Sequence, residues 1–512
     1  MQQIIEVIKQ AFGSIPFEQL LREFMLYSTK EPWFFTDFSF LFTFGIFLFF
    51  YALLFTQNAL RKIYLIAFSL FFYYKSSGPF LALFVFQIVV DFLFARKIEK
   101  EEGTSKQIWV SIAVLFSLSF LLYFKYPNFI LENTNWLLLT HFEPVDLFLP
   151  IGISFYTFQS ISYIVDVYRG EIRSSKSFLD YAFYMTFFPH LVAGPIVRAK
   201  DFLGQINSPE NLDARRYKES LFRIVTGLIK KLLIADYLGK YVDMVFENPS
   251  FYTGGENLLG ALAYSFQIYF DFSGYSDMAI GLALLLGYRL KENFENPYGS
   301  SNVTEFWRKW HISLSTWLRD YVYIPLGGNR KGALNTYLFL LITMLVGGFW
   351  HGANWTFIVW GALNALYIMP SIILNTNRNN LEIVAKGNFL PSIKDFINIL
   401  LTFSLTVIAW IFFRAASVGQ AFIYLKGIFS NSILSIPENL PKMELLLCGC
   451  FLFMEWLGRE NNYAIATFGK NWNIIFRWSF YLFLILLLVY FGAKEQNFIY
   501  FQFFLILGVF LL

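Results

Sequence analysis

The chain has 512 residues, of which 56% are apolar and only 15% are charged, and its mean hydropathy is +0.50. Soluble domains average about 45–50% apolar and about 25% charged residues. Aromatic residues make up 21% of the chain and phenylalanine alone fills 64 positions, which excludes disordered, collagenous and nucleic-acid-binding proteins. The net charge of +4 is too small to indicate a polyanionic partner. The composition predicts an integral membrane protein.

The N-terminal segment, residues 1–38, has no uninterrupted apolar stretch at its start. Charged residues interrupt it at Glu6, Lys9, Glu18, Arg22 and Glu23. This pattern predicts an amphipathic surface segment and not a cleaved signal peptide. No repeat or low-complexity linker divides the rest of the chain, so we expect residues 39–512 to form a single polytopic membrane domain.

Apolar runs follow one another through that domain. They lie near residues 39–56, 61–74, 79–95, 107–124, 147–168, 180–197, 221–246, 257–288, 333–350, 355–373, 396–413, 443–457, 474–492 and 497–512. A membrane helix takes about 20 apolar residues, so the chain has room for roughly 10 to 13 of them, although several runs are too short to cross unaided. The predicted fold class is all-α.

Basic residues favour the cytoplasmic loops of membrane proteins. In the first part of the domain they occur in alternate loops, at Arg61, Lys62, Arg96, Lys97, Lys100, Lys106, Arg169, Arg173 and Lys176. We therefore predict that these loops face the cytoplasm and that the acidic loop 125–146 faces outward.

This alternation fails after residues 180–197, because a further basic cluster follows where an outward loop is expected. Pro189, Gly194 and Pro195 interrupt the run. Broken backbone at membrane depth is tolerated only where protein or a water-filled cavity satisfies its polar groups. We therefore predict a re-entrant hairpin here, which places residues 304–331 on the cytoplasmic side.

Ionisable residues in apolar surroundings are costly in a membrane and mark candidate sites. Between Lys331 and Arg378 there is no Asp, Glu, Lys or Arg, and His351 is the only strongly ionisable side chain. Glycines precede and follow it, so backbones can approach closely there. A buried imidazole is largely neutral, as a general base requires. A helix-end histidine bonded to a neighbouring carbonyl is an equally open interpretation.

Residues 304–324 have the periodicity of an amphipathic interfacial helix. At 100° per residue one face collects Trp307, Trp310, Leu314, Trp317, Leu318 and Tyr321. His311 falls within this aromatic stripe and not on the charged face, which makes it a second candidate site residue. The alternative, a histidine at the level of the lipid headgroups, remains open.

Two aspartates, Asp271 and Asp277, are the only charges between Glu256 and Arg289. Buried carboxylates need cationic or hydrogen-bonding partners. We expect the partners to come from a basic group further along the chain, namely Arg308, Lys309, Arg319 or Arg330. Structural pairing is favoured over acid–base catalysis.

The remaining histidines, His141 and His190, have no partner at a metal-ligand spacing, so no metal site is predicted. Cys448 and Cys450 would point apart on a helix, which argues against a disulfide. Nucleotide-binding, zinc-protease and serine-hydrolase motifs are absent from the sequence.

Five strings together resemble the membrane-bound O-acyltransferase family, in the branch that contains the alginate O-acetyltransferase membrane subunit. They are Phe188-Pro-His-Leu-Val-Ala-Gly-Pro195, Asp271-Phe-Ser-Gly-Tyr-Ser-Asp277, Asn293-Phe-Glu-Asn-Pro297, Glu305-Phe-Trp-Arg-Lys-Trp-His311 and Phe349-Trp-His-Gly-Ala-Asn-Trp355. The core that bears these motifs runs from about residue 147 to about residue 375.

The resemblance implies membrane helices with re-entrant and interfacial helices around a central tunnel. It also implies an enzyme that has His351 as its catalytic residue and His311 as the second active-site histidine. Further residues of the motifs are expected to support the site or lie near it: Asp271, Asp277, Asn296, Glu305, Trp350 and Asn354. The family often has glutamine at the position of His190, so His190 receives no catalytic role.

The implied reaction is transfer of an acyl group, most often acetyl, from a cytoplasmic thioester such as acetyl-coenzyme A towards a hydroxyl of an extracytoplasmic polysaccharide or peptidoglycan. The resemblance further implies the bacterial inner membrane and an exported acetyltransferase or esterase-like partner. No tightly bound cofactor and no nucleic acid are expected.

The charge pattern adds a prediction about direction. His311 belongs to the segment assigned to the cytoplasmic side, and the following run of residues 333–350 would cover about 27 Å at 1.5 Å per residue, slightly less than a hydrocarbon core of about 30 Å. His351 should therefore lie past the middle of the membrane. We expect the two histidines to approach the reaction centre from opposite sides, so that the acyl group passes through the protein.

Three alternatives are considered. A protein-acylating relative is disfavoured, because the five strings match the polysaccharide branch better, and the other two stay open. The donor could be an acyl or D-alanyl carrier protein, as in teichoic-acid D-alanylation. A transporter without covalent chemistry would also place His and Asp residues at membrane depth.

Overall fold

The computed structural model describes residues 25–28, 32–211, 213–374, 383–438, 440–461, 463–467 and 472–492. Most of the predicted amphipathic segment 1–38 lies outside the described residues, as do Arg378 and the apolar run 497–512. Within the described ranges all regular elements are helices, as the sequence predicts.

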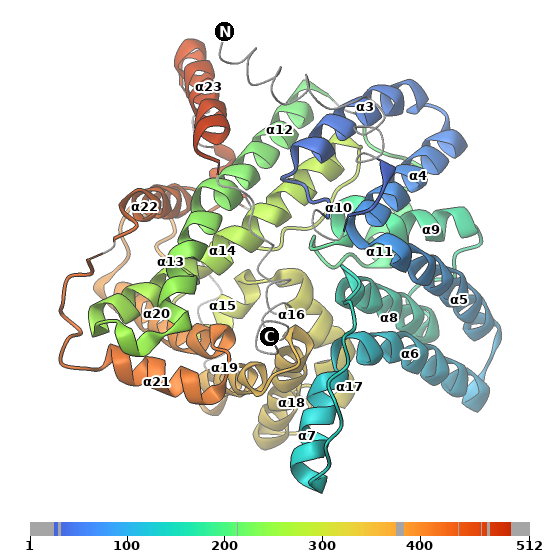
Figure 1. The fold of residues 1–512 in the computed structure, drawn as a ribbon. Coiled ribbons are helices and arrows are strands. Elements are labelled where there is room, and N and C mark those ends of the chain that lie inside the picture. Colours follow the sequence, from blue (N-terminus) through green and yellow to red (C-terminus); the bar gives the residue numbers. More distant parts are fainter. Residues whose placement is uncertain are drawn as a thin grey trace.

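The first helices follow the apolar runs of the sequence closely. They are α3 (Phe38–Leu54), α4 (Asn58–Ser77), α5 (Leu81–Lys100), α6 (Gly103–Lys125), α7 (Pro127–Leu138) and α8 (Ile153–Arg169). A short 3₁₀ turn, η1 (Gly78–Phe80), joins α4 to α5. Figure 1 shows this group in blue and cyan on one side of the molecule, with α7 projecting from its edge.

Five helical stretches of the described chain are long and apolar enough to cross a membrane: Asn58–Lys100, Gly103–Lys125, Ala333–His351, Trp355–Ile373 and Ile393–Arg414. Two shorter apolar helices begin at Phe38 and Ile474. These helices make the protein a multi-pass membrane protein.

The segment predicted to be re-entrant is broken, as expected. Helix α9 (Phe178–Thr186) ends before a separate turn, α10 (Phe188–Leu191), and the backbone then continues without helix to α11 (Ala199–Phe202) and the 3₁₀ turn η2 (Leu203–Gln205). All residues from 181 to 199 are buried. The broken backbone is therefore enclosed by protein, the condition under which a membrane protein tolerates it.

The longest helix is α14 (Gly254–Leu285), which begins with a capping box between Thr253 and Glu256. It packs along α12 (Ala214–Ile229), the π-helix η3 (Lys230–Ala235) and α13 (Asp236–Glu247); the turn η4 (Pro249–Phe251) connects α13 to α14. Figure 1 shows α12 and α14 side by side. A Cβ at Gly274 would lie 2.8 Å from the carbonyl oxygen of Gly227, so glycines allow the two helices to approach this closely.

The expected partners of the two buried aspartates were wrong. Lys231 pairs with Asp271 at 2.7 Å, and Lys230 pairs with Asp277 at 2.9 Å. Lys309 and Arg319, which the sequence analysis proposed, instead pair with Glu305 and Asp320. Both lysines lie in the π-helix η3, which packs directly against α14 and is therefore close to the two aspartates.

The predicted interfacial helix is also corrected. Residues 304–324 form α15 (Val303–Lys309) and α16 (Ile312–Leu318), followed by the π-helix η6 (Arg319–Tyr323) and the turn α17 (Ile324–Leu326). The chain bends between them at His311, which has a left-handed φ of 44°. The predicted stripe packs against protein, because Trp307, Trp310, Leu314, Trp317 and Leu318 are all buried. Figure 1 shows α15 and α16 near the centre, with other helices around them.

The remaining helices are α18 (Ala333–His351), α19 (Trp355–Ile373), α20 (Ile393–Arg414), α21 (Val418–Ile428), α22 (Lys442–Leu457) and α23 (Ile474–Phe491). Short 3₁₀ turns lie at Pro297–Gly299 (η5) and Ala464–Thr467 (η7). Helices α18 and α19 form a tight hairpin, because a Cβ at Gly348 would overlap the carbonyl oxygen of Phe357 and one at Gly361 would overlap that of Met344. The glycines next to His351 thus permit close backbone approach, as the sequence predicts.

Candidate active site

A cavity of about 550 Å³ runs along one face of α18. Its lining on this helix recurs at the spacing of a single helical face: Thr336, Leu340, Thr343, Gly347 and His351. The span from the first to the last of these residues is about 22 Å at 1.5 Å per residue. The cavity therefore extends along most of the helix and reaches the imidazole of His351.

The opposite wall of this cavity comes from α15, α16, η6 and α19. Trp360 lines it near His351, while Ile372 in the last turn of α19 lies at the other end, beside the first turn of α18. Two basic residues, Arg308 and Arg319, also contribute to the lining. The cavity is mostly apolar, and its lining includes these two arginines as well as His351.

His351 is 4% exposed and is enclosed by aromatic rings. Its ring lies 4.9 Å from that of Trp350, 5.1 Å from that of Trp360 and 5.1 Å from that of Phe413, measured between centroids, with interplanar angles of 73° to 88°. These edge-on contacts hold the imidazole at the end of the cavity in a fixed orientation.

His311 is fully buried and does not line this cavity. Its ring lies 4.6 Å from that of Phe272 and 6.3 Å from that of Trp350. Trp350 therefore contacts both histidines. The structure thus brings together the two histidines that the sequence analysis singled out, although 40 positions separate them.

Burial lowers the pKa of His311 to about 3. The ring is thus neutral over the whole physiological range. The headgroup-level interpretation of His311 is wrong, because a fully buried side chain has no contact with the membrane surface.

The other predicted residues near the site have identifiable structural contacts. Asn354 caps α19 by accepting from the backbone N–H of Thr356 at 3.0 Å. Glu305 is buried, accepts from the backbone N–H of Ser301 at 2.8 Å and pairs with Lys309 at 2.7 Å. Asn296 adopts a left-handed backbone conformation with φ 49° and lies against Gly299.

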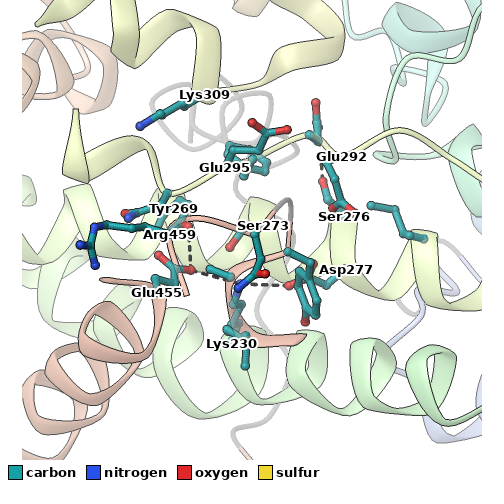
Figure 2. Close-up of a pocket in the computed structure, with 18 of the residues that line it drawn as sticks. Lys230, Tyr269, Ser273, Ser276, Asp277, Glu292, Glu295, Lys309, Glu455 and Arg459 are labelled. Atoms are coloured by element: carbon teal, nitrogen blue, oxygen red, sulfur yellow. Dashed lines mark hydrogen bonds and ion pairs between the residues drawn. The ribbon is translucent and has the colours of Figure 1, made fainter. Parts of the chain in front are cut away.

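A separate polar cavity of about 100 Å³ lies between α14, the loop 292–296 and the residues around α22. Figure 2 shows Lys230 between the carboxylates of Asp277 and Glu455, at 2.9 and 3.6 Å. The hydroxyl of Tyr269 donates to Glu455 at 2.8 Å. Asp271, by contrast, pairs away from this cavity with Lys231. Both aspartates of the third candidate site are therefore held in ion-paired clusters.

Two residues close to the histidines were not assigned a role by the sequence analysis. Asn293 contacts the ring of His311, at 3.2 Å between Asn293 Oδ1 and His311 Nδ1. Lys125, at the end of α6, donates to the carbonyl of Trp350 and to the hydroxyl of Ser154 at 3.3 Å. Lys125 follows a long apolar run, and this position could have marked it as a buried cation. No local sequence pattern indicates that Asn293 contacts His311, which is 18 residues further along the chain.

His141 lies in an exposed loop, and His190 is buried in the broken segment. Across the described residues, no group of three or more His, Cys, Asp or Glu is arranged to hold a metal ion.

Fold and site together define a multi-pass helical membrane protein with a buried histidine at the end of an internal cavity. Residues 111–413 match the family model of MBOAT, the membrane-bound O-acyltransferase family. The chain belongs to this family, and it is an acyltransferase enzyme.

Similar proteins of known name agree with this assignment. The chain is 44% identical over 370 residues to a probable alginate O-acetylase AlgI of Pseudomonas putida, covering 70% of this chain and 73% of that protein. It is 39% identical over 394 residues to a peptidoglycan O-acetyltransferase of Helicobacter pylori, covering 72% of this chain and 73% of that protein. A teichoic acid D-alanyltransferase of Bacillus subtilis is 29% identical to it over 239 residues, covering 44% of this chain and 60% of that protein.

Proposed function

We propose that this O-acyltransferase moves an acetyl group from a cytoplasmic thioester towards a hydroxyl of an extracytoplasmic polysaccharide or peptidoglycan. The observation that carries this proposal is the cavity along α18, which links two basic residues to His351. The names of the alginate and peptidoglycan O-acetylating relatives support the choice of acyl group and acceptor.

In the proposed reaction His351 is the general base. The hydroxyl oxygen of the acceptor attacks the thioester carbonyl carbon while the imidazole takes the hydroxyl proton. The carbon–sulfur bond then breaks, the acyl group is left on the hydroxyl oxygen as an ester, and the imidazolium returns the proton to the departing thiolate. The aromatic rings around His351 leave it only 4% exposed, which limits the access of water that would hydrolyse the thioester.

The cavity suits a long, narrow thioester arm. Arg308 and Arg319 line the same mostly apolar cavity as His351, and their guanidinium groups can bind phosphate, although Arg319 also pairs with Asp320. This arrangement fits coenzyme A, which carries phosphates at the end opposite its thioester. A carrier protein with a phosphopantetheine arm has the same chemistry, and the D-alanyltransferase relative keeps this donor as the second candidate.

We infer the direction of transfer from the charge pattern of the sequence. If the first turn of α18 faces the cytoplasm, the donor enters there and the acceptor reaches His351 from the other side. We accordingly place the enzyme in the bacterial inner membrane and propose an exported acetyltransferase or esterase-like partner that works on the polymer.

The proposal is tested with purified protein in proteoliposomes, supplied with acetyl-coenzyme A and an alginate or peptidoglycan oligosaccharide. Release of free thiol and formation of an acetyl ester are measured together. His351→Gln should lower the rate by about 10²–10⁴-fold, the usual contribution of a general base. His141→Gln, in an exposed loop, is the matched control and should retain the rate. Near-normal activity of a well-folded His351→Gln protein would reject the assignment.

Direction is tested separately with single cysteines at positions 336 and 351, in a background where Cys448 and Cys450 are replaced by alanine. An impermeant thiol reagent should label position 336 only from the cytoplasmic face, and saturating acetyl-coenzyme A, which has no free thiol to consume the reagent, should protect it. Labelling of position 336 from the outer face alone would contradict the proposed direction.

A further inference from the structure

The side-chain oxygen of Asn293 lies where three donors converge. The backbone N–H of Ser313 donates to it at 3.2 Å and the Ser313 hydroxyl donates at 2.9 Å. The third neighbour is Nδ1 of His311, also at 3.2 Å. Asn293 is fully buried, so water does not compete for these contacts.

The orientation of this amide is fixed independently of the histidine. A backbone N–H can only donate, so the Asn293 atom that faces the N–H of Ser313 must be the oxygen and not the nitrogen. The amide nitrogen then points the other way and donates to the hydroxyl of Ser276 at 3.3 Å. Nδ1 of His311 faces the same oxygen at 3.2 Å, and it also lies 3.4 Å from the Ser313 hydroxyl oxygen. Because that hydroxyl makes its shorter contact, 2.9 Å, by donating to Asn293, the geometry favours a hydrogen on Nδ1 that points to the Asn293 oxygen.

We propose that Asn293 is a positioning residue that holds His311 as the Nδ1–H tautomer and leaves Nε2 as a bare acceptor. Nε2 is buried and has no hydrogen-bond partner among the described residues. It is therefore the one ring atom available to a reacting group. This inference rests on the proposed function for its catalytic consequence, but the tautomer itself does not depend on that function.

Asn293 controls the backbone of His311 as well as its ring. His311 is the residue before the first turn of α16, has a left-handed backbone and makes no capping hydrogen bond with its own side chain. The carbonyl of Asn293 accepts from the N–H of Ile312 at 3.0 Å, and its side chain accepts from that of Ser313. One residue from a distant loop thus caps α16 and orients the histidine that begins it.

The proposed consequence is a division of labour between the two histidines. His351 lines the donor cavity, whereas His311 offers a neutral acceptor on the other side of Trp350. With the opposite tautomer, Nε2 would carry a hydrogen and could only donate. Loss of Asn293 should therefore impair the chemical step and leave binding of the donor intact, because Asn293 does not line the donor cavity.

The tautomer is measured by nitrogen NMR of protein labelled with ¹⁵N-histidine. The chain has only four histidines, and a His311→Asn variant identifies the signals of His311, since asparagine tolerates a left-handed backbone. We expect a protonated Nδ1 and a bare Nε2 in the wild-type protein. An Nε2–H tautomer or an imidazolium at neutral pH would overturn the proposal, whether or not the protein transfers acyl groups.

Two variants extend the test to the reaction. Asn293→Ala should shift the His311 signals towards the Nε2–H form and lower kcat by about 10²–10⁴-fold with little change in KM. Asn293→Asp keeps all three contacts to its oxygen but adds a negative charge, which favours the imidazolium. The Asp variant should regain activity at high pH, with the acid limb of its rate profile moved to higher pH.

Ser276→Ala is the matched control, because it removes only the partner of the amide nitrogen and should leave the tautomer unchanged. An Asn293→Asp profile that matches the wild type, or an Asn293→Ala protein with unchanged His311 signals, would overturn the positioning role. Absence of any acyl transfer by the wild-type protein would refute the proposed function alone, because the NMR result would still decide the tautomer.

Discussion

The buried ion pairs of Lys231 offer the most direct test of how the helical core is held together. Nζ of Lys231 lies 2.7 Å from carboxylate oxygens of both Asp236 and Asp271, and all three side chains are 3% exposed. Replacing Lys231 with methionine keeps the volume but leaves two carboxylates buried without that cation. Breaking a buried pair in this way costs about 3–5 kcal/mol.

The structure also ranks the neighbouring changes. Asp271→Asn leaves Lys231 paired with Asp236, so it should cost less than loss of the lysine. A matched control is Lys97→Met, because Lys97 pairs with Glu101 one helical turn away and its side chain is 48% exposed. Exposed pairs of this kind contribute little to stability, because water and salt screen them.

The assay is thermal stability of the purified protein in detergent, followed by the loss of monodisperse protein on heating, together with specific activity of the surviving fraction. Lys231→Met should lower the midpoint most, Asp271→Asn should lower it less, and Lys97→Met should not change it measurably. The reasoning is refuted if Lys231→Met is as stable as the Lys97 control. A stable but inactive Asp271→Asn protein would instead place Asp271 in the catalytic machinery.

Further predictions concern the cavity, the helical hairpin and pH. Thr343→Trp should fill the cavity and raise KM for the thioester at least tenfold in steady-state assays, whereas retained KM would argue that the donor binds elsewhere. Gly348→Ala should cost about 1–3 kcal/mol by forcing α18 from α19 and should lower kcat as His351 moves. Gly45→Ala, in a helix interior with open space, should lower neither stability nor kcat. Burial lowers the pKa of His311 to about 3, so between pH 6.5 and 3 the unfolded chain binds more protons than the folded protein does. The free energy of unfolding should therefore fall as the pH drops from about 6.5 towards 3, and it should fall less in His311→Gln.

Much of the fold was predictable because membranes impose strong rules on sequence. Long apolar runs mark the helices, and prolines with glycine in residues 180–197 mark the break that the structure contains. His351 was recognisable for the same reason, since it is the only strongly ionisable residue of a long uncharged stretch. These predictions depend on composition over one segment at a time, which a sequence displays directly.

The partners of Asp271 and Asp277 were not predictable by the same reasoning. Lys230 and Lys231 lie inside an apolar run, and ideal helical geometry would direct adjacent side chains about 100° apart. Both lysines lie in the π-helix that follows α12, beside the close crossing of α12 and α14 at their glycines, and each pairs with one of the aspartates there. A one-residue widening of a helix leaves no periodic trace in a single sequence.

The bend at His311 was hidden for a related reason. Its flanking residues continue the helical periodicity, so the stripe through Trp307 and Trp317 suggests one uninterrupted helix. What ends α15 and starts α16 is the loop at 293–295: Glu295 N–H donates to the carbonyl of Lys309, and Ile312 N–H donates to that of Asn293. Local patterns cannot reveal a bend that a distant loop imposes.

The polar cavity bears on the extent of the domain. The family match ends at residue 413, yet Glu455 on α22 reaches into the core and contacts both Lys230 and Tyr269. Without it, Lys230 would keep one carboxylate and the Tyr269 hydroxyl would lose its acceptor. The part of the chain beyond the family match therefore completes the charge balance beside α14. Asn293 borders the same cavity, so the surroundings of His311 depend, through one loop, on residues from both parts of the chain.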